Sequence, residues 1–475
     1  MRLTDTRQCR KFVEEVNAIA IQLGGTSLTK TQTTFIAFCI GSMVMLGCLN
    51  FAAFAAGSFG LFAARALSWM LHHSKIDWYT LLKAAVVKVL VDHGVATIHV
   101  EIDDTDRTRS KVIKILWGVF KTIDKVTGGW INAQNIVFLC LVTDKITIPI
   151  MFAFYRPDPV YSAWAKQDKK LRKKKIKKKD RPPAPKRDKR YPAKIEIAMK
   201  LLGTLRVFLG TIEPMLGRKL KVSSIAFDCA YLSPRIARFC RRMFPKIQVI
   251  SQIASNQIVW SRTGKPTRVD AFFKNIAPVE KEIFIRGTKQ KVSFIAARLT
   301  VKSHGRFLHI VALKYDGEAE YRYLAAVDLT WRSEDIIRAY ALRWLIEVAI
   351  FDWKQHDGWG RGAYQRGADG ACSGVILSLL VDCFLLTHPA QLRQSRAGLP
   401  LYTAGSVVRR IQYDNLLEGI EEIFASPDPQ KALKDLVQCV ERVIVLTPST
   451  KHMVGVEISD LGPSPSLRSI WSKAG

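Results

Sequence analysis

The chain has 475 residues, and this length supports more than one domain. Its 72 Lys and Arg exceed its 41 Asp and Glu by 31, which predicts a polyanionic partner and binding that weakens steeply with salt. The nine cysteines are odd in number and never spaced as Cys-x-x-Cys, the nine histidines show no ligand spacing, and neither a Walker nor a dinucleotide glycine loop occurs. We therefore expect a reducing, cytoplasmic location, no zinc site and no nucleotide cofactor.

Residues 1–93 predict a helical domain that begins with an apolar segment. No charged residue occurs from 31 to 64, and 34–53 is apolar enough to pass for a membrane span. Three scattered glycines, Ser42 and Asn50 favour instead a buried helix, followed by a glycine turn at 57–60 and a helix over 61–71. This pattern is typical of a DNA-binding helix-turn-helix and of any helical bundle, and a membrane span is the less favoured alternative. Charged residues ahead of the apolar run exclude a signal-peptide pattern.

Two short β-prone runs lead directly into acidic residues. The run 97–102 is followed by Asp103 and Asp104, and the run 222–227 is followed by Asp228. A hydrophobic strand that ends in Asp places a carboxylate at the edge of a buried sheet, where other strand ends and a helix can converge. Taken singly, each Asp is also explained as a turn or helix-capping residue.

A strongly basic segment lies between these two runs. From 166 to 190 the chain has fifteen Lys or Arg and three Asp, so this segment contributes +12 of the net charge of +31. Prolines interrupt it at 182, 183 and 185, and we expect a disordered loop, either merely solvated or acting as a phosphate clamp.

From 247 to 327 the sequence alternates apolar with polar residues in six short stretches, which predicts a β-rich insertion over 252–332. The next segment predicts a helix capped by Ser333. On that helix Tyr340, Arg343, Glu347 and Lys354 fall within an arc of roughly 60° at 100° per residue, while the remaining positions are mostly apolar. A stripe with a buried carboxylate between two bases has two explanations. It either forms internal ion pairs, or its acid binds a metal and the flanking groups bind phosphates.

The spacing Tyr-x-x-Arg-x-x-x-Glu-x-x-x-x-x-x-Lys resembles the signature of the DDE transposases of the insertion sequence 4 family, and residues 340, 343, 347 and 354 reproduce it without a gap. Asp-x-Thr at Asp103 and Asp-x-x-Tyr at Asp228 are similar to the first and second aspartates of that family. Asp104 is the alternative first acid. The resemblance covers about residues 95–390.

This resemblance implies a DNA transposase that excises and inserts an insertion sequence by cut-and-paste, with Asp103, Asp228 and Glu347 as catalytic metal ligands. Tyr340, Arg343 and Lys354 would contact DNA phosphates. Three carboxylates without His or Cys suit a pair of Mg²⁺ ions, with Mn²⁺ as a substitute, and two ions stabilise both the attacking and leaving oxygens of a phosphodiester. A hairpin intermediate and a homodimer on double-stranded DNA are implied by the resemblance alone.

The predicted fold class is α/β: a ribonuclease-H-like catalytic core interrupted by the β-rich insertion, with helical N- and C-terminal regions. The expected boundaries are 1–93 for the helical DNA-binding domain, 94–251 and 333–390 for the two parts of the core, 252–332 for the insertion, and 391–475 for a helical region with amphipathic stretches near 413–424 and 430–445. An inactive or domesticated relative that binds DNA without cutting it is the alternative function.

Overall fold

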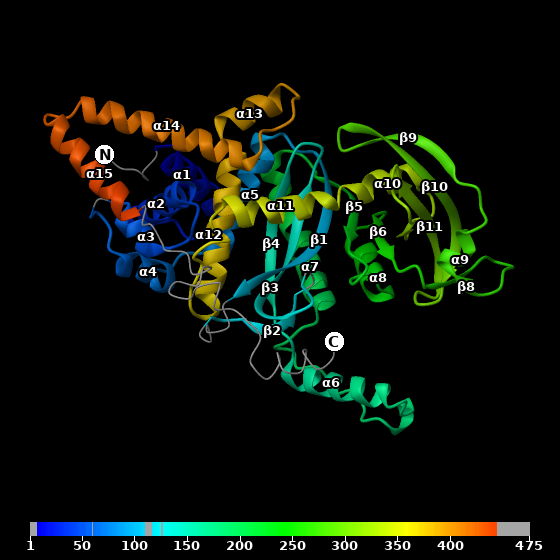
Figure 1. Ribbon diagram of the computed structural model, residues 1–475. Helices are drawn as coiled ribbons and strands as arrows, with labels where there is room; N and C mark the ends of the chain where they lie inside the picture. Colours follow the sequence, from blue (N-terminus) through cyan, green and yellow to red (C-terminus); the bar gives the residue numbers. More distant parts are fainter. Residues whose placement is uncertain (1–6, 59, 110–115, 125–126, 444–475) are drawn as a thin grey trace, which may run out of the picture.

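The computed structural model describes residues 7–58, 60–109, 116–124 and 127–443, and within them the strands form one mixed sheet (Figure 1). The strand order is β2-β3-β1-β5-β6-β12-β11-β10-β7-β8, with β4 paired to β3 and β9 paired to β10. Helices gather at the two ends of the chain, so the mixed α/β class with helical termini agrees with the prediction.

Five helices precede the sheet: α1 (Arg7–Gln22), α2 (Lys30–Leu46), α3 (Phe51–Ala56), α4 (Ala64–His73) and α5 (Trp78–Asp92). The apolar helix expected over 34–53 is in fact two helices, because Gly47 adopts a left-handed φ of 60° that ends α2 and the Asn50 side chain caps α3. Helix α2 is apolar because it is buried in the core, where it contacts α1, α12 and α14. The helix–glycine turn–helix pattern is present as α3 and α4, and a DNA-reading role for α4 stays a prediction.

Among the described residues, one helix is long and apolar enough to cross a membrane by length and composition, namely α12 (Gly367–Leu386). Of its most apolar stretch, 78% is buried inside the protein, so packing against the neighbouring helices accounts for its composition.

The central strands are β1 (Thr97–Arg109), β2 (Phe120–Ile123), β3 (Trp130–Val142), β4 (Thr147–Tyr155), β5 (Lys221–Phe227) and β6 (Gln248–Ile253). The prediction that the first strand ends at Ile102 is wrong, because β1 continues through Asp103 and Asp104 to Arg109. Strand β3, which is almost wholly buried, pairs with β1 along this whole length, from His99 opposite Val142 to Arg109 opposite Asn132. Tertiary pairing therefore overrides the low strand propensity of the charged segment.

Helix α7 (Lys194–Leu216) precedes β5 and packs on β3 and β4, and helix α8 (Pro234–Met243) connects the parallel strands β5 and β6 and packs on β6. The strands predicted between 252 and 332 are present as β7 (Ile258–Trp260), β9 (Val279–Ile285), β10 (Thr288–Val301), β11 (Arg306–Tyr315) and β12 (Arg322–Ala326). The short strand β8 (Thr267–Arg268) and the short helix α9 (Val269–Phe273) lie between β7 and β9 and were not predicted. Because β12 pairs with β6, these strands continue the central sheet.

The helix expected to carry the signature is broken into α10 (Ser333–Ala341) and α11 (Trp344–His356). At the break the backbone hydrogen bonds span three residues and not the four of an α-helix; for example, the Arg343 N–H donates to the Tyr340 carbonyl at 3.0 Å. Ser333 is the first helical residue and not the cap, and its hydroxyl lies 3.3 Å from Nε2 of His309. The signature residues therefore lie on two helices that meet at Arg343.

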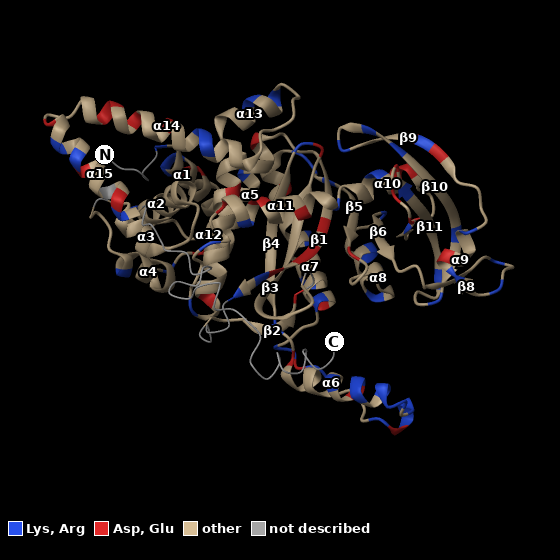
Figure 2. Cartoon of the chain, in the orientation of Figure 1, with Lys and Arg blue, Asp and Glu red and all other residues tan. Residues whose placement is uncertain are grey.

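The basic segment is also ordered, contrary to the prediction. Helix α6 (Pro159–Lys173) extends away from the body of the protein, and Figure 2 shows Lys and Arg concentrated toward its far end. Asp158 caps this helix, and the buried Asp168 pairs with Arg172 at 2.8 Å and with Arg181 at 2.7 Å after the turn η1 (Lys178–Asp180). These local carboxylates offset part of the repulsion between the bases and fold the segment back on itself.

The last described helices are α13 (Pro389–Arg396), α14 (Ala404–Phe424) and α15 (Pro429–Val443). Helix α14 begins about nine residues before the predicted amphipathic stretch, because the Thr403 hydroxyl caps it by accepting the Ser406 N–H.

Candidate active site

Parallel pairing of two strands brings Asp103 and Asp228 together. Ile102 of β1 is opposite Phe227, the last residue of β5, so the next residue on each chain is an aspartate. Adjacent strands lie about 4.8 Å apart, and the Asp228 carboxylate is close enough to contribute to the raised pKa of Asp103. Two acids that are 125 positions apart in the sequence therefore lie side by side on adjacent strands.

The alternation of side chains along β1 separates Asp103 from Asp104. Asp103 lies on the face covered by α11, where Arg343 Nη1 is 3.2 Å from its Oδ2. Asp104 lies on the opposite face, where Lys194 of α7 is 2.6 Å from its carboxylate and the Tyr231 hydroxyl donates to it at 3.1 Å. Of these two acids, Asp103 is the one placed on the side of the signature helix.

Arg343 joins the first and third predicted acids. Besides its contact with Asp103, its Nη2 donates to Oε1 of Glu347 at 2.5 Å. Glu347 lies one turn along α11 with 46% of its side chain exposed, so the prediction of a buried carboxylate is wrong. The break between the two helices turns Glu347 toward solvent and leaves Arg343 inside, between the two carboxylates.

The pKa of Asp103 is raised to about 6, chiefly by burial, while the N–H of Asp104 and the Arg343 guanidinium oppose the rise. Burial alone would lower the pKa of Arg343, but the neighbouring Tyr340 phenol and Glu347 carboxylate reverse that effect and raise it. At neutral pH the site therefore contains a fixed guanidinium cation with carboxylates on two sides.

The two other signature residues lie at opposite ends of this group. The Tyr340 ring is 5.8 Å from the Arg343 guanidinium carbon, and its hydroxyl donates weakly to Gln252 at 3.4 Å. The Lys354 ammonium donates to the Thr105 hydroxyl at 2.5 Å and to the Asp106 carbonyl at 2.8 Å, so it is fixed on β1 two to three residues beyond Asp103. Arg343 and Lys354 thus anchor α11 to the strand that carries the first acid.

Glu101 is a member of this site that the sequence reasoning missed. It is fully buried on the same face of β1 as Asp103, and neither of its carboxylate oxygens has a hydrogen-bond partner. Burial raises its pKa well above the usual range, with Arg343 opposing the rise. Its position two residues before Asp103 was a usable signal, because alternate residues of a strand share a face.

Carboxylate oxygens are the ligands that Mg²⁺ and Mn²⁺ prefer, so the chemistry of Asp103, Asp228 and Glu347 fits a divalent cation. Their arrangement fits it only in part. Among the described residues, no three His, Cys, Asp or Glu side chains are grouped closely enough to hold a metal ion, because the Arg343 guanidinium lies between Asp103 and Glu347.

No protein-family model matches the chain, and no curated protein matches it significantly in sequence. Among solved structures, it is similar to a cryo-EM structure of a piggyBac transposase synaptic complex with hairpin DNA. The two share 12% sequence identity over 94% of this chain and 85% of that chain, with a TM-score of 0.37. At this level the match by itself assigns no activity to the chain.

Proposed function

We propose that the chain is a metal-dependent DNA transposase of the DDE type, similar to the insertion sequence 4 family, that cleaves and rejoins phosphodiester bonds. The observation that carries the proposal is that three acids from distant parts of the sequence lie in one region: Asp228 follows the strand that pairs with the strand of Asp103, and Arg343 contacts both Asp103 and Glu347. A purely structural ion pair would need one acid, whereas here a single guanidinium is surrounded by Asp103, Glu347 and the unpartnered Glu101.

In this proposal Asp103, Asp228 and Glu347 hold Mg²⁺, or Mn²⁺ in its place, and the bound metal supplies Lewis-acid stabilisation of the phosphoryl oxygens. Arg343 neutralises the acids before metal and DNA bind, and it then turns its fork of N–H donors to the scissile phosphate. Tyr340 and Lys354 contact neighbouring phosphates from either side.

The partners follow from the same proposal: double-stranded DNA at the ends of the element and at the target. The net charge of +31 supports a polyanionic ligand, and the basic arm α6 extends far enough from the body to reach DNA outside the site. We further propose a homodimer on DNA, since two ends must be held together, and a cytoplasmic location.

The test is cleavage of a linear DNA that carries both ends of the chain's own element. Wild-type protein, Glu347→Gln and the matched control Glu418→Gln, an exposed acid on α14, are incubated with Mg²⁺, Mn²⁺ or EDTA. We expect nicks at the element boundary with wild type and control in either metal, and none with Glu347→Gln or in EDTA. If wild type and both variants bind the element ends specifically and none of them cleaves, the alternative function is favoured, namely a protein that binds DNA without cutting it. In such a protein Arg343 would permanently occupy the place of the metal.

A further inference from the structure

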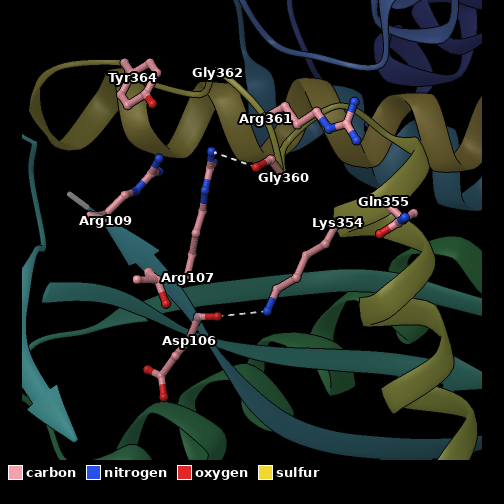
Figure 3. Close-up of a pocket in the computed structure, with 10 residues that line it drawn as sticks. Asp106, Arg107, Arg109, Lys354, Gln355, Gly360, Arg361, Gly362 and Tyr364 are labelled. Atoms are coloured by element: carbon pink, nitrogen blue, oxygen red, sulfur yellow. Dashed lines mark hydrogen bonds between the residues drawn. The ribbon is translucent and has the colours of Figure 1, made fainter. Parts of the chain in front are cut away.

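A second group of cations lies further along β1, outside the signature. An open cavity of about 500 Å³ lies between the end of β1, the end of α11 and the loop 357–366, and Figure 3 shows the residues that line it. Arg107 and Arg109 project into it from alternate positions of β1, Arg361 and Tyr364 border it on the loop, and Lys354 closes the side toward the acids.

Arg107 is buried to 91% without a counter-charge. Its guanidinium stacks 4.3 Å from the centre of the buried Trp359 ring, and its Nη2 donates to the Gly360 carbonyl at 3.2 Å. Its Nη1 is buried without a hydrogen-bond partner. Burial and the neighbouring Arg109 lower the pKa of Arg107 to about 9, so the cation is held in place at a cost in stability.

Arg109 is fixed in the same manner. Its guanidinium carbon lies 5.5 Å from the Trp359 ring and 5.8 Å from the Tyr364 ring, and its Nε and Nη2 donate to the Gln134 amide oxygen. Within the described part of the chain, no carboxylate forms an ion pair with Arg107, Arg109 or Arg361. Among the described residues that line the cavity, the one acid is Asp106; Figure 3 shows its carboxylate directed away from Arg107 and Arg109, and it accepts a hydrogen bond from the Asn135 amide at 2.8 Å.

The loop that covers Arg107 is held tightly by the fold. A Cβ on Gly360 would lie 1.9 Å from the Lys354 carbonyl oxygen, so only glycine allows the loop to approach the end of α11 this closely. The Leu49 N–H donates to the Arg361 carbonyl at 3.0 Å, which ties the loop to the amino-terminal helices. The Arg107 and Arg109 guanidinium groups and the backbone of Arg361 are therefore preorganised, as a binding site requires.

We infer that Arg107, Arg109 and Arg361 form a second anion site, which holds one backbone phosphate of the DNA strand that runs past the carboxylates. This inference rests on the proposed function and adds to it a contact at a defined place on the strand. Arg107 is four residues beyond Asp103, or about 13 Å along an extended strand. Successive phosphates of one duplex strand are about 7 Å apart, since they turn around the helix axis as well as rising along it, so the phosphate lies about two nucleotides from the scissile bond.

The first arm of the test measures binding of inorganic phosphate by thermal unfolding, with sodium chloride of equal ionic strength as reference. The variants are Arg107→Met, which replaces the buried cation with an apolar chain, and Arg361→Gln, which is exposed and leaves the packing intact. Arg396→Gln on the exposed surface of α13 removes the same charge elsewhere. We expect phosphate to raise the Tm of wild type and Arg396→Gln, and to have little effect on Arg107→Met.

The second arm uses phosphate-ethylated DNA ends. Ethylation of one phosphate about two nucleotides from the cut is expected to weaken binding by wild type about tenfold and to have no effect on Arg107→Met or Arg361→Gln. The slope of log K against log salt should also fall by about 0.9 in each of these variants. The Arg396→Gln control should retain both the interference and the slope of wild type.

Equal stabilisation of wild type and Arg107→Met by phosphate would refute the anion site, whatever the protein does with DNA. Phosphate could raise the Tm of wild type and not of Arg107→Met, while ethylation weakens DNA binding by both proteins equally. This result would mean that the cavity binds a free phosphate compound, and it would overturn the inference. If wild type neither binds nor cuts DNA, the proposed function fails, and the thermal arm still decides whether the anion site exists.

Discussion

Arg343 is expected to stabilise the folded protein through Asp103 far more than through Glu347. Both contacts are short, but the Arg343 and Asp103 side chains are only 19% and 18% exposed, whereas Glu347 is 46% exposed. At 3.2 Å and an effective dielectric constant of 20, the gross attraction of the inner pair is about 5 kcal/mol. Desolvation reduces this to a net coupling of about 2 kcal/mol. For the outer pair, solvent screening leaves about 0.5 kcal/mol.

Two double-mutant cycles measure these couplings separately. Arg343→Gln is combined with Asp103→Asn in one cycle and with Glu347→Gln in the other, and unfolding by urea is followed at pH 7.5 in EDTA, since urea does not screen charges. At pH 5 the inner coupling should shrink toward that of the outer pair, because Asp103 has a pKa of about 6 and loses its charge as the pH falls through that value. An outer coupling equal to or larger than the inner one at pH 7.5 would refute the reasoning, and so would an inner coupling that is the same at both pH values.

Two further predictions concern residues around the loop 357–366. Burial raises the pKa of Asp382 to about 7 and that of Asp357, whose carboxylate oxygens have no partner, well above its usual range. The folded protein therefore binds more protons than the unfolded chain and loses stability as the pH rises from about 4 through 7. Asp357→Asn should raise the free energy of unfolding by about 1–3 kcal/mol at pH 8 and leave it nearly unchanged at pH 3.5, as measured by thermal unfolding at the two pH values; a gain of equal size at both would contradict this. Gly360→Ala should lower the free energy of unfolding by about 3 kcal/mol or more, because the added Cβ would lie 1.9 Å from the Lys354 carbonyl oxygen. Gly210 is on the exposed side of α7, where an added Cβ has no atom within 4 Å, so Gly210→Ala should raise the free energy of unfolding by about 0.5–1 kcal/mol. Urea unfolding compares the two variants, and similar losses in both would show that the loop is not tightly packed.

The parts of the fold that local periodicity determines were predictable from the sequence. The six alternating stretches before the signature correspond to strands of the sheet, because a strand with one buried face must alternate. The helical ends and the two β-prone runs that lead into Asp103 and Asp228 also follow from local patterns.

Features that depend on distant partners could not be read locally. The segment from Asp103 to Arg109 is almost entirely charged or polar, and it is a strand only because β3 pairs with it over its full length. Neither glycine nor proline occurs at the helix break at Arg343, so the sequence gives no local signal for it. At the break the Arg343 guanidinium contacts the Asp103 and Glu347 carboxylates. The order in α6 was partly foreseeable, since Asp168 is four residues before Arg172.

The odd-numbered positions of β1 explain why this strand is central to both proposals. Glu101 and Asp103 are followed on the same face by Thr105, Arg107 and Arg109, so the charge changes from negative to positive along one side of a single strand. The spacing between the acids and the anion site is therefore set by the strand itself and does not depend on how helices or loops move. The long pairing with β3 fixes the register, and a slip of one residue would turn Asp104 and Asp106 toward α11 and both arginines away from the cavity. A DNA strand that runs along this face would meet metal-binding acids at one end and a phosphate-binding site at the other, at a separation that thermal motion changes little.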